Sequence, residues 1–184
     1  MDSRHVRQTL LAEVASLAIL FATASRVDAG DGGQKFADHG VALIVPRGWW
    51  ASGRQMSSGV EPVFRVTLSD RALHRTQQDS GPCYGGIARQ IQPDGVVAIL
   101  REAFGADFKP ARFHLRSRRF VLPPRKLHED NSCLGDHATL VIFRQAGRGF
   151  YLWIAAGAKA PAAKIAALLR ALDAMSITGA STAK

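Results

Sequence analysis

The sequence predicts an α+β fold: a single antiparallel β-sheet of six to seven strands with a C-terminal amphipathic helix packed on one face. Three observations lead to this prediction. Most apolar runs are short and rich in β-branched residues, turn signals with Gly or Pro separate them, and helical periodicity occurs near the C-terminus. Strands joined mainly by hairpins favour an antiparallel sheet over repeated β-α-β units. The chain has no internal repeat, and we expect one domain over residues 41–178.

The first two expected strands flank a loop of small residues. Residues 41–46 (VALIVP) form a short apolar run that ends in Pro46-Arg47-Gly48, which is typical of a strand that enters a turn. Residues 62–69 (PVFRVTLS) alternate between two sets of side chains and predict a half-buried strand. Polar residues with Gly81-Pro82 follow, so residues 70–83 are expected to form a long loop.

Two hairpins are expected further along the chain. Residues 84–92 and 96–102 flank Pro93-Asp94-Gly95, and a Pro-Asp-Gly turn between two apolar runs is a hairpin signal. Residues 138–145 and 150–156 flank a second turn that contains two glycines. Apolar side chains occur on both faces of this second pair, which predicts central strands that are covered on each side.

A helix is expected to begin near Pro161, because the missing N–H of a proline costs nothing in the first helical turn. Its apolar side chains recur at the spacing of one helical face: Ile165, Leu168, Leu169, Leu172 and Met175. Residues 176–178 are expected to add a short strand, and residues 179–184 a loose tail. The loops at 70–83 and 123–136 are expected to cover the other face of the sheet.

Residues 1–29 have the order of features of a secretory signal peptide. A basic start precedes an apolar run at 14–24, which is too short to span a bilayer as a helix. Val27 and Ala29 stand at positions −3 and −1 of a small-residue cleavage site. We therefore expect cleavage after Ala29, a flexible lead-in over 30–40, and a secreted or extracytoplasmic protein of the cell envelope. The alternative is a retained N-terminal helix or anchor.

Two cysteines, Cys83 and Cys133, lie in the part of the chain that follows the expected signal peptide. An even cysteine count in an exported chain predicts a disulfide between them. Such a bond would close a loop of about 51 residues and would stabilise the fold by roughly 4 kcal/mol in the chain-entropy description. The alternative is a pair of free thiols.

The strongest anomaly of the sequence is a basic strand candidate at residues 111–122. Between Lys109 and Lys126 there are seven Lys or Arg residues and no acid. Period-2 alternation places Phe113 and Leu115 on one face and a basic row on the other, formed by Arg112, His114, Arg116 and Arg118. A row of guanidinium groups can hold phosphate or carboxylate groups bidentately, so these four are candidate binding residues. The alternative is a solvated edge strand, because charged side chains protect sheet edges from pairing.

Several features are similar to those of a known family. The first strand runs into Val45-Pro46-Arg47-Gly48-Trp49, a Pro-Asp-Gly-Val turn follows, and the helix ends in an Asp-Ala-Met-Ser-Ile segment at 173–177. This layout over residues 36–178 resembles small secreted bacterial proteins of unknown function and, more distantly, the PsbP-like superfamily. The resemblance implies an antiparallel sheet flanked by helices. It also places the chain near accessory or binding subunits and lipoproteins.

Catalytic, cofactor and metal signatures do not stand out. Gly-x-Ser-x-Gly, phosphate-loop and dinucleotide patterns are absent after residue 29. The spacing of His128, Cys133 and His137 does not match the common zinc patterns, and we expect neither a metal nor a cofactor. One enzymatic alternative is a secreted thiol hydrolase, with Cys83 as the nucleophile and His137 as the base.

Charge favours an anionic partner. Removal of residues 1–29 takes away three basic and three acidic residues, so the formal net charge stays at +9. We expect an exported, non-catalytic extracytoplasmic binding or accessory domain, whose partner is an anionic envelope polymer, a lipid headgroup or a protein. No apolar stretch after residue 30 reaches 18 residues, so we do not expect an integral membrane protein after cleavage. Nucleic acid is not an expected partner, because no recognised binding motif is present.

Overall fold

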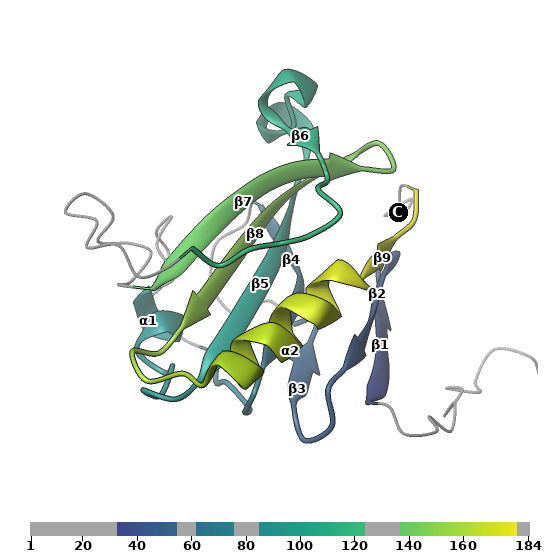
Figure 1. The fold of residues 1–184 in the computed structure, drawn as a ribbon. Helices are drawn as coiled ribbons and strands as arrows, with labels where there is room; N and C mark the ends of the chain where they lie inside the picture. The colour runs from purple at the N-terminus through teal and green to yellow at the C-terminus, as the bar shows by residue number, and fades with distance from the viewer. Residues whose placement is uncertain (1–32, 55–61, 76–84, 124–136, 180–184) are drawn as a thin grey trace, which may run out of the picture.

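The computed structural model describes residues 33–54, 62–75, 85–123 and 137–179. They form a mixed α+β fold with a six-stranded sheet, a three-stranded sheet and a C-terminal helix (Figure 1). The expected fold class is confirmed, whereas the expectation of a single sheet is wrong. The first expected strand pairs on both of its edges with short neighbours, so neither edge is free to join the larger sheet.

The larger sheet has the strand order β3-β4-β5-β8-β7-β6. Its strands, in that order, are β3 (Trp50–Ser52), β4 (Val63–Ser69), β5 (Val96–Ala103), β8 (Arg148–Ala156), β7 (Ala138–Gln145) and β6 (His114–Leu115). Neighbouring strands are antiparallel except for the β6–β7 pair, which is parallel. The two-residue β6 stands last in the strand order, so it is an edge strand.

The smaller sheet has the order β1-β2-β9, with β1 at Gln34–Asp38, β2 at Val41–Val45 and β9 at Ser176–Ile177. Five residues of the segment expected to be a flexible lead-in (30–40) thus form a strand. A tight turn makes this possible, because His39 and Gly40 both adopt positive φ angles, 45° and 74°. The polar composition of β1 gave no strand signal in the sequence. The strand forms because it pairs with the apolar β2.

One of the two expected hairpins forms. Strands β7 and β8 pair in register around Ala146 and Gly147, whose φ angles of 52° and 76° suit a two-residue hairpin turn. The other hairpin is wrong. Residues 84–92 contain the short helix α1 (Gly85–Ala88), and the Pro93-Asp94-Gly95 turn leads from it into β5. Both edges of β5 are already occupied by β4 and β8, which leaves no edge for a further strand.

The expected C-terminal helix is α2 (Ala162–Asp173), which lies across one face of the larger sheet (Figure 1). Leu168 and Leu172 of its apolar stripe are fully buried. They belong to a front cluster between the larger sheet, α2 and the smaller sheet, which includes Val41, Leu68, Leu100, Phe143, Phe150 and Leu152. A second cluster covers the back face and includes Phe64, Leu73, Ile87, Ile99 and Trp153. Leu73 belongs to the loop at 70–83, which was expected to help cover this face and is described as far as residue 75.

A buried ion cluster joins the two sheets at the end of β5. Glu102 Oε2 accepts hydrogen bonds from Arg65 Nε at 2.5 Å and Arg148 Nη2 at 2.6 Å, and Glu102 Oε1 accepts one from Arg148 Nε at 2.7 Å. A register shift in the β4–β5 pairing at Arg65 lets this side chain reach Glu102. Arg148 Nη1 also donates to the carbonyl oxygen of Thr178, which follows β9. Each of the three charged residues is at most 5 % exposed.

Burial by itself raises the pKa of Glu102, but hydrogen bonds from Arg148 and Arg65 and the charges of both outweigh it, so the pKa lies below its ordinary value. Glu102 is therefore ionised at neutral pH. Arg65 lies in the segment at 62–69 that was expected to form a half-buried strand, and its hydrogen bond to Glu102 explains why a charge is tolerated there.

We expect Glu102→Gln to destabilise the protein by about 3–5 kcal/mol, because it leaves two arginines buried without a carboxylate. Chemical denaturation of the variant and the parent measures this loss. Asp107→Asn removes one negative charge at an exposed position and should change the unfolding free energy by less than about 0.5 kcal/mol. Similar losses in the two variants would contradict the structural role of Glu102.

Candidate functional site

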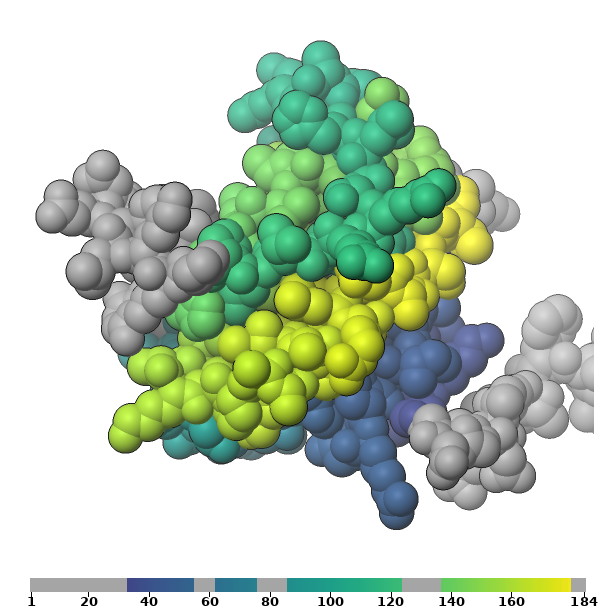
Figure 2. All heavy atoms as spheres, in the orientation of Figure 1, coloured from purple at the N-terminus to yellow at the C-terminus, as the bar shows by residue number. Residues whose placement is uncertain are grey.

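The basic segment at residues 111–122 wraps around an edge of the larger sheet instead of extending it as a full strand, and we call it the wrapping segment. On the back face, the ring of Phe113 lies 5.3 Å from the ring of Tyr151. On the front face, the ring of Phe120 lies 5.6 Å from that of Phe143. Between them, β6 pairs with β7 for two residues only. Figure 2 shows the teal segment projecting at the top of the molecule and then running beside α2.

The prediction of a strand at 111–122 is therefore wrong except at His114–Leu115. The four basic residues expected to line one face of that strand do not share a strand face. Arg112 ends a 3₁₀ turn (Pro110–Arg112). Leu115, expected to share a face with Phe113, is 75 % exposed, whereas Phe113 is buried. Period-2 alternation requires a continuous ladder, and the chain leaves the ladder after two residues in order to reach the front face. Arg112, His114 and Arg118 are exposed as expected.

Arg116 has a different role from the other three candidates. Its guanidinium donates to the carbonyl oxygens of Leu172 (2.7 Å), Asp173 (3.0 Å) and Met175 (2.6 Å) at the end of α2. It also donates to Gln145 Oε1 at 2.8 Å. The last carbonyl groups of a helix have no partner within the helix and carry partial negative charge, so a guanidinium there satisfies them.

Burial lowers the pKa of Arg116, and the charge of Asp173 partly opposes this effect. Asp173 Oδ1 also accepts a hydrogen bond from the backbone N–H of Phe120 at 2.7 Å. Hydrogen bonds from two residues, Arg116 and Phe120, therefore attach the wrapping segment to the end of the helix. Arg116 is a structural residue that holds this segment in place.

Beside Arg116 lies an open hollow with a volume of about 700 Å³. Its walls include three arginines and one large apolar side chain: Arg116, Arg118, Arg144 and Leu115. Arg144 is paired with Leu115 in the β6–β7 register and is exposed. Sequence reasoning missed Arg144, because only the parallel pairing of two distant segments brings it to this place.

We use the name basic edge for five exposed residues of this region: Arg112, His114, Arg118, Arg119 and Arg144. Within the part of the chain that the structure describes, none of the ion pairs involves these five residues. The acid that lines the hollow is Asp173, whose carboxylate already accepts a backbone hydrogen bond. The basic edge therefore presents positive charge to the solvent.

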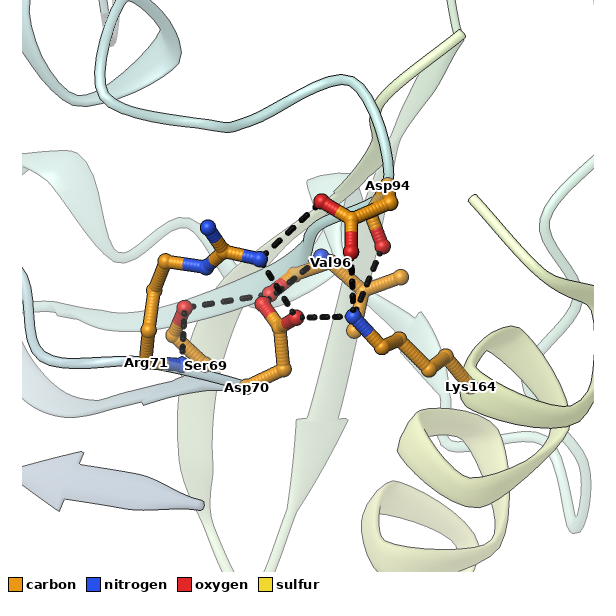
Figure 3. A network of polar contacts seen from close by, with 6 residues as sticks. All are labelled: Ser69, Asp70, Arg71, Asp94, Val96 and Lys164. Atoms are coloured by element: carbon orange, nitrogen blue, oxygen red, sulfur yellow. Dashed lines mark hydrogen bonds and ion pairs between the residues drawn. The ribbon is translucent and has the colours of Figure 1, made fainter. Parts of the chain in front are cut away.

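A second charged cluster lies at the other end of the fold, where α2 begins (Figure 3). Lys164 Nζ donates to Asp70 Oδ2 at 2.7 Å and to Asp94 Oδ2 at 3.1 Å. Arg71 Nη2 donates to Asp94 Oδ1 at 3.0 Å, and the backbone N–H of Val96 donates to Asp70 Oδ1 at 3.1 Å. The Pro93-Asp94-Gly95 turn is thereby fixed to β4 and to the first turn of α2.

The pKa values of this cluster favour charged side chains. Burial raises the pKa of Asp70, but hydrogen bonds from Lys164 and the Val96 amide outweigh it and leave the pKa below its ordinary value. Hydrogen bonds from Lys164 and neighbouring positive charges lower the pKa of Asp94, and hydrogen bonds to both acids raise the pKa of Lys164. A lysine held in its ammonium form is neither a nucleophile nor a base near neutral pH. The cluster is suited to holding the turn.

The residues of the expected disulfide, Cys83 and Cys133, lie outside the described residues. The disulfide and the Cys83–His137 hydrolase therefore stay predictions. His137 is half-buried, and its backbone oxygen accepts a hydrogen bond from Ala156.

Among the described residues, no group of three or more His, Cys, Asp or Glu side chains could hold a metal ion. None of the helices described here has the length and apolar character needed to cross a membrane.

Comparisons with models of protein families, with curated proteins and with solved structures give no match for this chain. The resemblance to the PsbP-like superfamily stays a prediction that rests on the Val45–Trp49 motif and the layout of the chain.

We expect Arg116→Gln to lower the unfolding free energy by roughly 1–3 kcal/mol, because hydrogen bonds between a charged donor and the helix carbonyls are lost. Arg118→Gln removes the same charge two residues away and should change stability by less than about 0.5 kcal/mol. Urea denaturation followed by circular dichroism compares both with the parent. Equal effects would show that Arg116 does not hold the segment to α2.

The Asp70–Lys164 pair should contribute to the pH dependence of stability. A carboxyl group whose pKa is lowered by folding stabilises the protein above its unfolded pKa, and the effect is lost as the pH falls through the folded pKa. In Lys164→Met this contribution is reduced. The difference in unfolding free energy between parent and variant should therefore shrink between about pH 6 and pH 3.

Denaturation curves at several pH values measure this difference. Lys159→Met is the control, since Lys159 is exposed and takes part in none of the ion pairs among the described residues. A constant difference across the pH range in Lys164→Met would refute the role of the pair.

Proposed function

We propose that this protein is an exported, non-catalytic binding or accessory domain of the cell envelope, and that its basic edge contacts anionic envelope components. The observation that carries the proposal is the contrast between this surface and the other charged clusters. Glu102 and Asp70 bind the cations around them, whereas the basic edge has four exposed arginines outside the ion pairs of the described residues.

The chemistry of the basic edge suits phosphate and carboxylate groups. A guanidinium is planar, keeps its charge, and offers parallel N–H donors that match these anions. The excess of basic over acidic residues, with a formal net charge of +9, favours encounter with negatively charged partners. Export is supported by the signal-peptide pattern of residues 1–29. An accessory role agrees with what the PsbP-like resemblance implies.

The basic row expected from the sequence is revised by the fold. Arg116 leaves the set because its donors are used at the end of α2. Arg119 joins it because it is exposed beside Arg118, and Arg144 joins it because it lies next to Leu115. A test of anion binding should therefore leave Arg116 intact.

We expect the triple variant Arg112→Gln, Arg118→Gln, Arg144→Gln to elute from a heparin matrix at clearly lower salt than the parent, because salt screens the exposed charges that hold it. The matched control replaces three exposed arginines elsewhere, Arg47, Arg89 and Arg170, with Gln and has the same net charge. The control should elute closer to the parent. Equal shifts in both triple variants would mean that only net charge matters and would overturn the proposal.

A further inference from the structure

The segment that carries most of the basic edge also carries the two most exposed large apolar side chains among the described residues. Leu115 is 75 % exposed and Val121 is 66 % exposed, against 49 % for Ile44 and 40 % for Leu140. A single exposed leucine needs no explanation. Here two such side chains fall within a segment that also carries Arg112, Arg118 and Arg119. Apolar and cationic groups are therefore presented together.

Contacts of the residues on either side of Leu115 fix the backbone so that the Leu115 side chain stays exposed. On one side, Phe113 packs between the rings of Phe108 and Tyr151, each with a ring-centroid distance of 5.3 Å. On the other, Arg116 is bound to the end of α2 by its three carbonyl contacts. The backbone of β6 also pairs with β7 at this point. The exposed position of Leu115 thus follows from the path of the chain around the sheet edge.

Cations surround this leucine. Arg144 is its partner in the β6–β7 register, and Arg118 lines the same hollow. An anionic polymer offers charge to such a surface but gives Leu115 nothing apolar to contact. The interface of an anionic bilayer offers both, because acyl chains lie just beneath the phosphate groups. Long arginine side chains can keep their charged ends at the phosphate level while their stems lie lower.

We propose that the basic edge docks on the surface of an anionic lipid bilayer, with Leu115 entering the headgroup region and Arg118 and Arg144 contacting lipid phosphates. This inference rests on the proposed function and names its partner. The protein would lie on the membrane surface, and the docked residues would come from the sheet edge and the wrapping segment.

Sedimentation with vesicles tests the inference with the full chain. Vesicles of phosphatidylcholine alone are compared with vesicles that contain phosphatidylglycerol as well. Residues 14–24 are common to the parent and all variants, so a difference in partition between them reports the substituted side chain. The parent should bind the phosphatidylglycerol vesicles more strongly. Leu115→Gln should lower this partition coefficient about tenfold, because the apolar contact is lost.

Two further variants test whether the effect on vesicle binding is specific to Leu115. Leu115→Trp should raise the partition coefficient, since tryptophan favours the bilayer interface, and sedimentation of the variant without vesicles shows whether aggregation contributes. Ile44→Gln, an exposed apolar position on β2, is the matched control and should leave partition unchanged. The Arg112, Arg118 and Arg144 triple variant should lose the preference for phosphatidylglycerol.

The outcomes separate this inference from the proposed function. If Leu115→Gln binds vesicles as the parent does while the triple variant loses heparin retention, the bilayer inference is overturned and an anionic polymer or an acidic protein takes its place. If the triple variant also keeps its heparin retention, both proposals fail. A decrease for Leu115→Gln on vesicles, with unchanged retention on heparin, supports bilayer docking.

Discussion

The central β5–β8 pair imposes the main constraint on this structure, because both of its faces need cover. Every residue of β5 and all of β8 except Tyr151 are buried. A single helix of 12 residues cannot cover two faces of a sheet. The front face is completed by the smaller sheet and by Phe120, and the back face by side chains such as Phe113 and Ile87. Most other elements can be understood as cover for this pair.

The wrapping segment follows from that constraint. It supplies Phe113 to the back face and Phe120 to the front face, so it must cross the edge of β7 between them. At the crossing it pairs with β7 for two residues, His114 and Leu115, and both are exposed. Arg116 fixes the crossing by binding the carbonyl groups at the end of α2. Leu115 and the arginines around it are exposed because the chain turns over the edge there.

The sequence predicts the elements whose periodicity is complete within one segment. Helix α2 belongs to this group, because Leu168 and Leu172 of its apolar face are the residues that it buries. The β7–β8 hairpin also belongs to it, because a two-residue turn joins its strands. Periodicity does not record which sheet edges are free. Polar β1 and the failed hairpin at 84–92 both depend on edge occupancy, which is decided by distant partners. Exposure of three site residues could be predicted, whereas the roles of Arg116 and Arg144 depend on contacts with segments far along the chain.

The distribution of acids links the fold to the charge on its surface. The chain has 24 Lys and Arg residues against 15 Asp and Glu residues, so acids are the scarcer partner. Glu102 neutralises charge inside the fold, Asp70 and Asp94 hold the turn before β5, and Asp173 binds the wrapping segment. The carboxylate of such an acid already accepts hydrogen bonds, so it has little capacity left to pair with an exposed arginine nearby. Positive charge therefore gathers where the chain is basic and structural acids are already bound, and the crossing at β6 meets both conditions.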